Sequence, residues 1–193
     1  MSKLIIIGAG GHGKVVADAA NRDCVFLDDN QELNDAVGSI DQLSEIQNDG
    51  DEVVVAIGDN KKRLEVLSGI SRIATIIHPS AVISTSASMG EGTVVFANVV
   101  VNVTVVIGKG CILNTASSVD HDCVLGDGVH ISPGAHLGGE VVVGDCSWVG
   151  IGASVKHGVT IGKNVIVGAG AAVVSDIPDG VTFVGVPAKE LKQ

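Results

Sequence analysis

Aromatic rings and positive charges are scarce in this chain, and each shortage excludes a class of structure or partner. Only 2% of the 193 residues are aromatic, although 46% are hydrophobic. Because small aliphatic side chains fill only narrow spaces, the core must be built of thin, regular layers. Lys and Arg number 12 against 22 Asp and Glu, for a formal net charge of −10. This balance argues against nucleic acid as a partner, since phosphate neutralisation supplies most of the affinity of such complexes.

Paired cysteines and long apolar runs are also missing. The four cysteines, at positions 24, 111, 123 and 146, form no C-x-x-C motif, so neither a zinc knuckle nor a redox pair is indicated. The apolar run near the N-terminus is too short for a signal peptide, and no stretch approaches the ~20 apolar residues of a membrane-spanning helix. We therefore expect a cytoplasmic protein that does not insert into a membrane.

What the sequence does contain is a six-residue repeat. From Ile77 to Val173, an aliphatic residue recurs at every sixth position without a break, and a small or β-branched residue stands four positions after almost every one. A period of six fits neither an α-helix nor a heptad coiled coil. It is the hexapeptide repeat of a parallel β-helix, in which three units make one triangular coil of 18 residues. The pattern predicts a prism of five to six coils with no inserted loop.

The segments before and after the repeat differ from it. Residues 1–76 are expected to form a β-α-β-α-β arrangement, half of a Rossmann fold: strands at 3–7, 24–27 and 53–57, and helices from Lys14, near 41–47 and after Asn60. Residues 77–176 form the β-helix domain. In the tail, 177–193, Pro178 and Pro187 break the period and are expected to end the stack. The G-x-P-A-K stretch at 185–189 either caps the last coil or contacts a cofactor.

A glycine-rich loop follows the first expected strand. Gly8, Gly10 and Gly13 have the G-x-G-x-x-G spacing of phosphate-binding turns, and Asp28 and Asp29 follow the second strand, where such folds bind a ribose. Three strands suffice for one nucleotide, which favours a mononucleotide sugar over NAD. The alternative is a tight turn without a ligand, and Asp59 with Asn60 could be only a helix N-cap.

Because one coil contains 18 residues, residues 18 apart in the sequence should lie next to each other in adjacent coils. His121, Gly139 and His157 must form one column outside the prism, with room beside His121 for a thioester. Asp120 and Asp122 flank His121, which suits a general base. His130 lies half a coil away, so one chain cannot bring both histidines to one site. Together with an apolar outer wall, such as residues 99–101 and 141–142, this predicts a homotrimer with clefts between subunits. The lone indole, Trp148, is expected at an interface rather than in an adenine pocket.

Four segments together resemble one family: GAGGHGKVV (8–16), FLDD (26–29), VAIGDNKKR (55–63) and NTASSVDHDCVLGDGVHISPGAHLGG (114–139). The family is that of the bacterial sugar acetyltransferases, which includes UDP-4-amino-sugar N-acetyltransferases of bacillosamine synthesis, perosamine N-acetyltransferases and sialic acid O-acetyltransferases. The resemblance implies a left-handed β-helix, acetyl-CoA as co-substrate, no metal, and transfer of acetyl to the amino group of a UDP-linked 4-amino-4,6-dideoxy sugar.

The resemblance also assigns roles by position. His121 matches the general base, and Asp122 matches the carboxylate that raises its basicity. The other matching positions fall into two groups, acceptor-substrate contacts at Gly10, Gly11, His12, Asp28, Asp29, Asn60 and Asn114, and acetyl-CoA contacts at His130, Gly139 and Ala169. At Ala169 a glycine would be usual, so that contact departs from the family pattern.

Three alternatives remain open from the sequence. One is O-acetylation of sialic acid or another sugar, which would leave the glycine loop without a nucleotide. Another is the γ-type carbonic anhydrase, which shares the β-helix, but its pair of zinc histidines five positions apart is missing. The third is a non-catalytic, trimeric nucleotide-sugar-binding protein.

Overall fold

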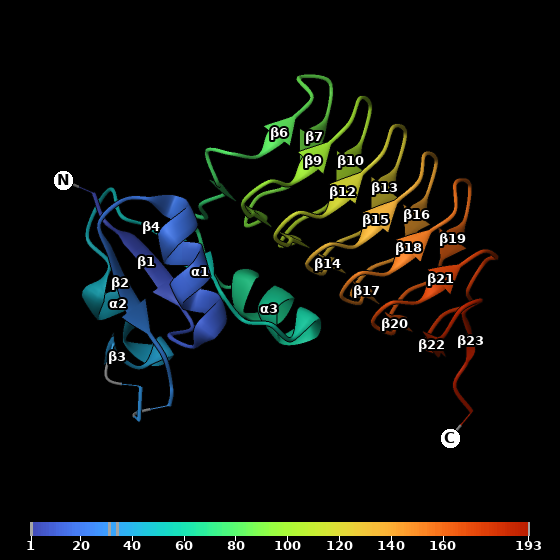
Figure 1. Ribbon diagram of the computed structural model, residues 1–193. Coiled ribbons are helices and arrows are strands. Elements are labelled where there is room, and N and C mark those ends of the chain that lie inside the picture. Colours follow the sequence, from blue (N-terminus) through green and yellow to red (C-terminus); the bar gives the residue numbers. More distant parts are fainter. Residues whose placement is uncertain (1, 31, 34, 193) are drawn as a thin grey trace.

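The computed structural model describes residues 2–30, 32–33 and 35–192, which form a small α/β domain and a long three-sided prism (Figure 1). In Figure 1 the α/β domain, in blue to teal, lies beside the first coils of the prism, and the chain then runs coil by coil to the C-terminus, in red at the lower right. None of the helices in the described ranges is long and apolar enough to cross a membrane.

The α/β domain is built on a parallel sheet with the strand order β3-β2-β1-β4. The apolar runs at 4–7, 24–27 and 52–55 become β1 (Leu4–Ile7), β2 (Cys24–Leu27) and β4 (Glu52–Val55), which confirms the predicted alternation of strands and helices. The edge strand β3 (Ala36–Gly38) was not expected, because three residues carry no periodic signal. All four residues of β1 are fully buried, as a parallel sheet covered on both faces requires.

The helices differ from the prediction at their ends. Helix α1 (Gly11–Ala20) begins at Gly11 rather than Lys14, since Gly10 already serves as its extended N-cap. A β-carbon at Gly13 would lie 1.9 Å from the carbonyl oxygen of Gly8, so only glycine lets the first turn pack this closely on the loop. The helix expected near 41–47 is a short 3-10 turn, η1 (Ile40–Gln42), followed by α2 (Leu43–Ile46). Helix α3 (Asn60–Leu67) is capped by Asp59, whose Oδ1 accepts the Lys62 N–H at 2.8 Å.

The prism is a left-handed parallel β-helix with three walls. The first wall contains β5 (Ile76–Ile77), β8 (Val94–Val95), β11 (Ile112–Leu113), β14 (His130–Ile131), β17 (Trp148–Val149), β20 (Ile166–Val167), β22 (Thr182–Val184) and β23 (Lys189–Glu190). The second wall contains β6 (Val82–Ile83), β9 (Val100–Val101), β12 (Ser118–Val119), β15 (His136–Leu137), β18 (Ser154–Val155) and β21 (Ala172–Val173). The third wall contains β7 (Ser88–Met89), β10 (Val106–Ile107), β13 (Val124–Leu125), β16 (Val142–Val143) and β19 (Thr160–Ile161).

The register confirms the 18-residue coil. Val106 pairs with Val124, and Val124 pairs with Val142, each 18 residues further along the chain. From Val95 onward the aliphatic residue of each hexad is buried in one continuous core. The residue before it faces outward, so Val100 and Val142 are exposed while Val99 and Val141 are buried. The apolar outer wall is therefore narrower than the runs 99–101 and 141–142 suggest.

The tail lengthens the stack instead of ending it at the last hexad. Ile177 pairs with Ile161 and is buried in the prism core, and β22 pairs with β20 in parallel. Strand β23 then turns back along β22. Ala188, inside the G-x-P-A-K stretch, is buried in the same core, so this stretch closes the open end of the prism.

The two domains share a core. Phe96, Val94 and Ile112 of the first wall form one buried cluster with α1 and one face of the sheet. Helix α3 lies on the corner between the third and first walls, where Gly92, Gly110 and Gly128 are stacked at positive φ. A β-carbon at any of them would meet Leu64 or Leu67 within 3.1 Å. These glycines let α3 dock directly against the prism.

Candidate active site

The glycine loop divides its residues between packing and open space. At Gly8, with φ of +111°, a β-carbon would lie 2.6 Å from the Ala56 carbonyl oxygen, and Gly13 packs on Gly8 in turn. At Gly10 and Gly11 no atom lies within 4 Å of the β-carbon position. The two central glycines therefore border empty space at the start of α1, where no side chain caps the helix.

The two aspartates after β2 hold the backbone around this loop. Asp28 accepts the N–H groups of Ala9 and Asn30, each at 2.8 Å, and Asp29 accepts the N–H of Ile40 at 3.0 Å. Both carboxylates lie at the carboxyl end of β2, as the sequence predicts. Through these hydrogen bonds, the two carboxylates fix the shape of the glycine loop and the segment beside it.

A pocket of about 750 Å³ lies between the α/β domain and the first wall of the prism. The first turns of α1 and α3 both open onto it, so two helix N-termini, each a centre of partial positive charge, face the same space. The side chains around it are mostly apolar or uncharged. The lining residues are Gly11, His12, Val15, Gly58, Asp59, Asn60, Lys61, Phe96, Ile112, Asn114, His130, Cys146, Trp148, Asn164 and Ile166.

Two histidines from different domains meet at the pocket in the neutral form. His12 of α1 contacts the edge of Phe96, at 5.5 Å between ring centroids, and burial together with the nearby Arg63 lowers its pKa to about 4. His130 of β14 stacks on Trp148 at 5.3 Å, and burial lowers its pKa to about 3. Among the described residues, His12 Nε2 and His130 Nδ1 are buried without a hydrogen-bond partner.

Asn114 and His130 lie side by side in this pocket. The Asn114 amide nitrogen is 3.1 Å from His130 Nε2, and Asn114 Oδ1 accepts the N–H of Thr115 at 2.9 Å. The predicted acceptor contact and the predicted acetyl-CoA contact are thus neighbours. Trp148 lies in the wall of this pocket, where its indole N–H donates to Ser132 Oγ at 2.6 Å.

Arg63 joins the two domains behind the pocket, a role that was not predicted from the sequence. Its guanidinium is buried and donates to the carbonyl oxygens of Gly110 and Gly128 in the prism, and to those of Ile57 and Gly58 before α3. Its fifth bond goes to Asn60 Oδ1 at 2.8 Å. Burial lowers the pKa of Arg63 to about 10, so the group stays charged.

Asn60 is part of the same junction. Its amide nitrogen donates to the carbonyl oxygens of Cys146 and Ser147, at 3.1 and 3.3 Å, while its oxygen accepts from Arg63. The side chain borders the pocket but its polar atoms already have partners within the chain. Its proposed contact with the acceptor substrate stays a prediction.

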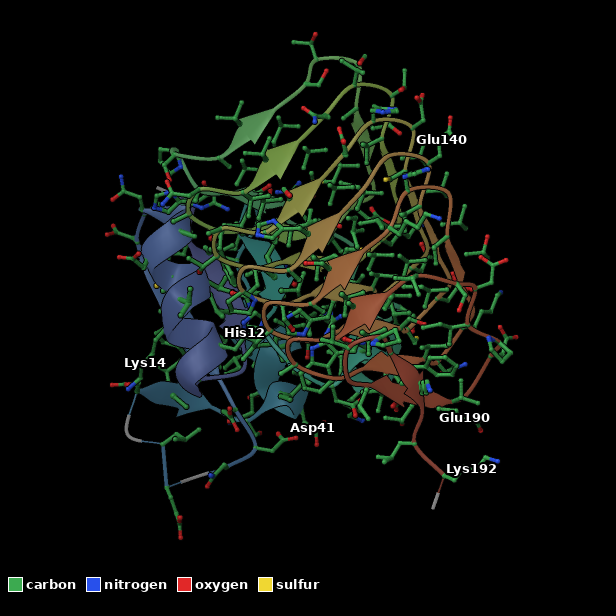
Figure 2. The ribbon with its side chains drawn as sticks, turned by 45° about the vertical axis from the view of Figure 1, so that its right-hand side comes forward. His12, Lys14, Asp41, Glu140, Glu190 and Lys192 are labelled. Atoms are coloured by element: carbon green, nitrogen blue, oxygen red, sulfur yellow. The ribbon has the colours of Figure 1, made fainter. Side chains whose placement is uncertain are left out.

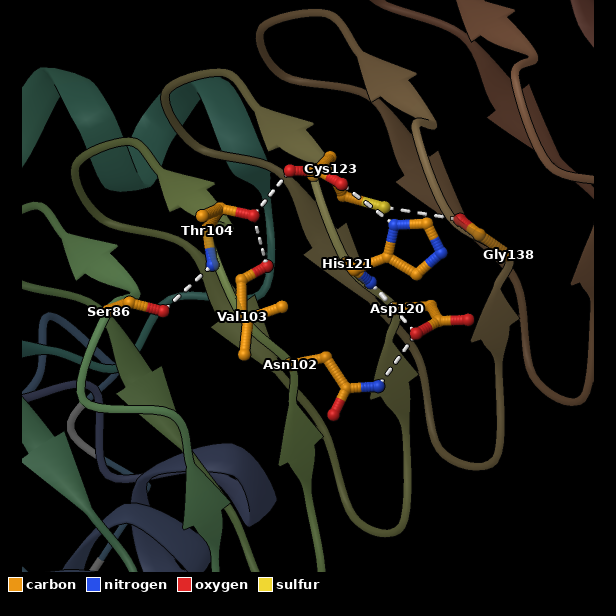
Figure 3. Close-up of polar contacts among 9 residues, drawn as sticks. Ser86, Asn102, Val103, Thr104, Asp120, His121, Cys123 and Gly138 are labelled. Atoms are coloured by element: carbon orange, nitrogen blue, oxygen red, sulfur yellow. Dashed lines mark hydrogen bonds and ion pairs between the residues drawn. The ribbon is translucent and has the colours of Figure 1, made fainter.

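His121 lies elsewhere, on the exposed corner between the second and third walls (Figure 3). Its Nδ1 is 2.8 Å from Asp122 Oδ2, and its backbone N–H donates to Asp120 Oδ1 at 2.8 Å. The hydrogen bond to Asp122 raises the pKa of His121, with further contributions from Asp120 and Glu140. A histidine held in this way, with Nε2 available, can accept a proton near neutral pH.

Gly139 is beside His121, as the 18-residue spacing predicts, but the expected free space next to it is absent. A β-carbon there would lie 2.5 Å from both Cε1 and Nε2 of His121. The space above Gly139 is therefore filled by the imidazole ring itself and is not left for a thioester. Without a side chain at 139, the ring can lie flat along the prism corner.

Within one chain, the pocket and His121 lie on different sides of the prism. Figure 2 places His12 between α1 and the prism and Glu140, next to Gly139, on the opposite side. Ala169 is in the exposed turn between β20 and β21, at a third corner. The structure brings His12, Asn60, Asn114 and His130 together, and it leaves His121 with Asp122 apart from them. Among the described residues, no group of three or more His, Cys, Asp or Glu is placed to hold a metal ion.

Known proteins match both domains. A family model described as the PglD N-terminal domain matches residues 3–70, and one described as bacterial transferase hexapeptide (six repeats) matches residues 140–174. The acetyltransferase domain of PglB from Neisseria gonorrhoeae, solved with acetyl coenzyme A, is 43% identical, with a TM-score of 0.94 and 98% of each chain covered. PerB from Caulobacter crescentus, solved with CoA and GDP-perosamine, is 40% identical, with a TM-score of 0.91 over 100% of this chain and 98% of that one. This chain belongs to the same family of bacterial sugar acetyltransferases.

A curated member of this sugar acetyltransferase family is the UDP-N-acetylbacillosamine N-acetyltransferase of Bacillus subtilis (strain 168). It is 38% identical over 110 residues, which is 49% of this chain and 51% of the relative. The match therefore spans about half the length of that relative. The family resemblance inferred from the sequence is confirmed, and with it the left-handed β-helix.

Proposed function

We propose that this chain transfers the acetyl group of acetyl-CoA to the amino group of a UDP-linked 4-amino-4,6-dideoxy sugar, with His121 as the general base. The observation that carries the proposal is the pairing of a mostly apolar pocket at two helix N-termini with an exposed His–Asp pair on another corner. Relatives with the same fold bind CoA with GDP-perosamine, or are named for a UDP-sugar. The pocket and the base supply the two halves of one reaction.

The nucleotide sugar fits the pocket by charge and space. A diphosphate is favoured where helix N-termini present unpaired N–H groups, and α1 and α3 both begin at the pocket. The open space at Gly10 and Gly11 allows the phosphates to approach the backbone closely. We assign the uridine to Asp28 and Asp29, which hold the backbone of this loop, and the sugar to His12 and Asn114, which line the pocket.

His121 takes the proton that the neutral amine loses as it attacks the acetyl group. The amine nitrogen forms a bond to the acetyl carbon while the bond from that carbon to the CoA sulfur breaks, and the amine proton passes to His121 Nε2. His121 then gives this proton to the CoA sulfur, which leaves as the thiol. Asp122 holds Nδ1 protonated, which keeps Nε2 as the acceptor and stabilises the imidazolium. His130, Gly139 and Ala169 are the proposed acetyl-CoA contacts.

The separation of pocket and base requires a second copy of the chain. We propose a homotrimer in which His121 of one subunit faces the pocket of its neighbour. Exposed valines on the second and third walls, Val100, Val106, Val124 and Val142, supply apolar surface for such a contact.

Mixing two inactive variants tests both statements. His121→Ala removes the base, and Gly11→Leu places a side chain in the pocket at a position with no atom within 4 Å of the β-carbon. Each variant alone should be inactive, and refolded mixtures should recover roughly a quarter of the sites, because a neighbouring pair can combine one intact base with one intact pocket. Mixtures that stay inactive would contradict the shared site.

Substrate identity needs a separate measurement. Mass spectrometry of acetyl transfer from acetyl-CoA over UDP- and GDP-linked amino sugars should give a product with a UDP-linked 4-amino sugar, labelled on nitrogen. A product labelled on oxygen, or transfer to GDP-linked sugars alone, would contradict the proposed acceptor. Binding of the nucleotide sugar without any transfer would favour the non-catalytic alternative.

A further inference from the structure

The carboxylate that holds His121 is itself held from the previous coil. Thr104 precedes Asp122 by 18 residues and so lies next to it on the same corner of the prism. The Thr104 hydroxyl donates to Asp122 Oδ1, while Asp122 Oδ2 is 2.8 Å from His121 Nδ1. Ser86, one coil earlier, accepts the backbone N–H of Thr104 at 3.1 Å (Figure 3). Each oxygen of the carboxylate thus has a different partner.

The hydroxyl proton has two acceptors within reach. Besides Asp122, the Val103 carbonyl oxygen lies 2.7 Å from Thr104 Oγ1. A hydrogen bond to an ionised acceptor is roughly twice as strong as one between neutral groups, which favours Asp122. In agreement, the Thr104 hydroxyl is the main cause that lowers the pKa of Asp122, ahead of His121.

The backbone at Thr104 gives an independent observation. Its φ is +60°, in the left-handed region, and Thr104 is the one β-branched residue at positive φ in the described ranges. A β-branched residue is rarely found there, because its branched β-carbon crowds the neighbouring backbone. Equivalent turns elsewhere in this prism use Gly, as at Gly110 and Gly128, Asn, as at Asn98 and Asn164, or another unbranched residue, as at Ala116, Asp122, Glu140 and Cys146. A strained residue of this kind persists where its side chain is needed.

We propose that Thr104 is a positioning residue for acetyl transfer: its hydroxyl fixes the Asp122 carboxylate, which in turn orients the His121 ring. The inference rests on the proposed role of His121 as the base. Asp122 is exposed and could rotate away from the imidazole if only one of its oxygens were held. Fixing both oxygens keeps the ring in place and its Nδ1 proton on the carboxylate side.

Two substitutions of nearly equal size separate the hydroxyl from the shape of the side chain. Thr104→Val keeps the branched shape and the strained backbone but loses the hydroxyl, and Thr104→Ser keeps the hydroxyl. We expect kcat/KM to fall about 10-fold in Thr104→Val, through kcat, and to stay within about 2-fold of the parent in Thr104→Ser. KM for both substrates should not change in either variant.

The pH profile gives a readout that a merely structural role would not move. The charged groups that face His121 are Asp120, Asp122 and Glu140, and none is altered by these variants. With Asp122 less firmly held, the acidic limb of the kcat profile should move to lower pH in Thr104→Val and stay unchanged in Thr104→Ser. A third variant, Thr104→Gly, should lose activity like Thr104→Val without a lower melting temperature, because glycine relieves the strain.

The outcomes distinguish this inference from the proposed function. Equal activity and equal pH profiles for Thr104→Val and Thr104→Ser would overturn it, as would a loss in both. If His121→Ala retains acetyl transfer, the proposed function itself fails. If His121→Ala is inactive while Thr104→Val behaves like the parent, only the positioning role of Thr104 fails.

Discussion

The pocket and the exposed corner use the same side chain in opposite electrostatic environments. At the pocket, His12 and His130 are withdrawn from water near the buried cation Arg63, and their pKa values fall to about 4 and about 3. On the corner, His121 stays in water beside Asp122, and its pKa rises. Burial disfavours the charged imidazole, whereas a neighbouring carboxylate favours it. A histidine's surroundings, and not its presence in a motif, therefore decide whether it can exchange protons near pH 7.

The comparison also separates binding from chemistry. The neutral histidine and asparagine side chains at the pocket can form hydrogen bonds to a sugar without taking up or releasing protons near pH 7. The corner offers little enclosed space but has an ionised carboxylate to support a base. Neither region is sufficient alone, and this motivates the proposed contact between subunits.

Removal of the base should give the largest effect. We expect His121→Ala to lower kcat/KM for acetyl transfer by about 10²–10⁴-fold while leaving the affinity for UDP unchanged, since general-base catalysis supplies an effect of that size. Steady-state kinetics and isothermal titration with UDP measure the two quantities. His157→Ala, an exposed residue in the same column, is the matched control and should behave like the parent. Weaker UDP binding in His121→Ala would contradict the separation of binding at the pocket from catalysis at the His121 corner.

Arg63→Met tests whether the pocket depends on the junction between domains. The carbonyl oxygens of Gly110 and Gly128 would lose their buried donors, and we expect a loss of roughly 2–5 kcal/mol in the free energy of unfolding. Chemical denaturation measures this loss, and UDP binding should weaken with it. Arg22→Met, which breaks an exposed ion pair with Glu52, should cost less than about 1 kcal/mol. Similar losses in both variants would contradict the special position of Arg63.

Gly139→Ala should disturb His121 on the exposed corner and leave the pocket unchanged. A β-carbon 2.5 Å from Cε1 and Nε2 must displace the His121 ring, and we expect kcat to fall by about 10–100-fold. UDP affinity and melting temperature should stay close to those of the parent. Gly69→Ala, where the nearest atom is 3.6 Å from the β-carbon position, serves as the control. Full activity of Gly139→Ala would mean that the ring position does not matter.

The pH dependence of kcat/KM should report the protonation of His121 alone. As a base, His121 must be unprotonated, so kcat/KM should fall as the pH drops through its pKa, with a midpoint above the ordinary value of about 6.5. Asp122→Asn removes the hydrogen-bonding carboxylate, and its midpoint should lie lower. His12 and His130 stay neutral throughout this range and should add no further limb. An acidic limb that survives unchanged in Asp122→Asn would assign it to another group.

The sequence predicted the prism well because its period is a property of the chain itself. Once the coil length is known, residues 18 apart must be neighbours, and the closeness of His121 and Gly139 follows. The same subtraction from Asp122 leads to Thr104, so that contact could have been found from the sequence. Arg63 could not, since its acceptors in the prism are backbone carbonyls 47 and 65 residues further along the chain, and carbonyls leave no trace in residue identity. The sequence also could not show that the His121 ring occupies the space at Gly139, because this depends on the rotamer of His121.

The docking of α3 on the stacked glycines has a consequence for how this architecture can change. The α/β domain is tied to fixed rungs of a ladder whose spacing is about 4.8 Å. His121 lies between Gly110 and Gly128 in the chain, so the proposed base belongs to the same coils that hold α3. Whole turns could therefore be added or removed beyond Gly128 without changing the level of His121 relative to the α/β domain, whereas smaller insertions would break the packing of the prism.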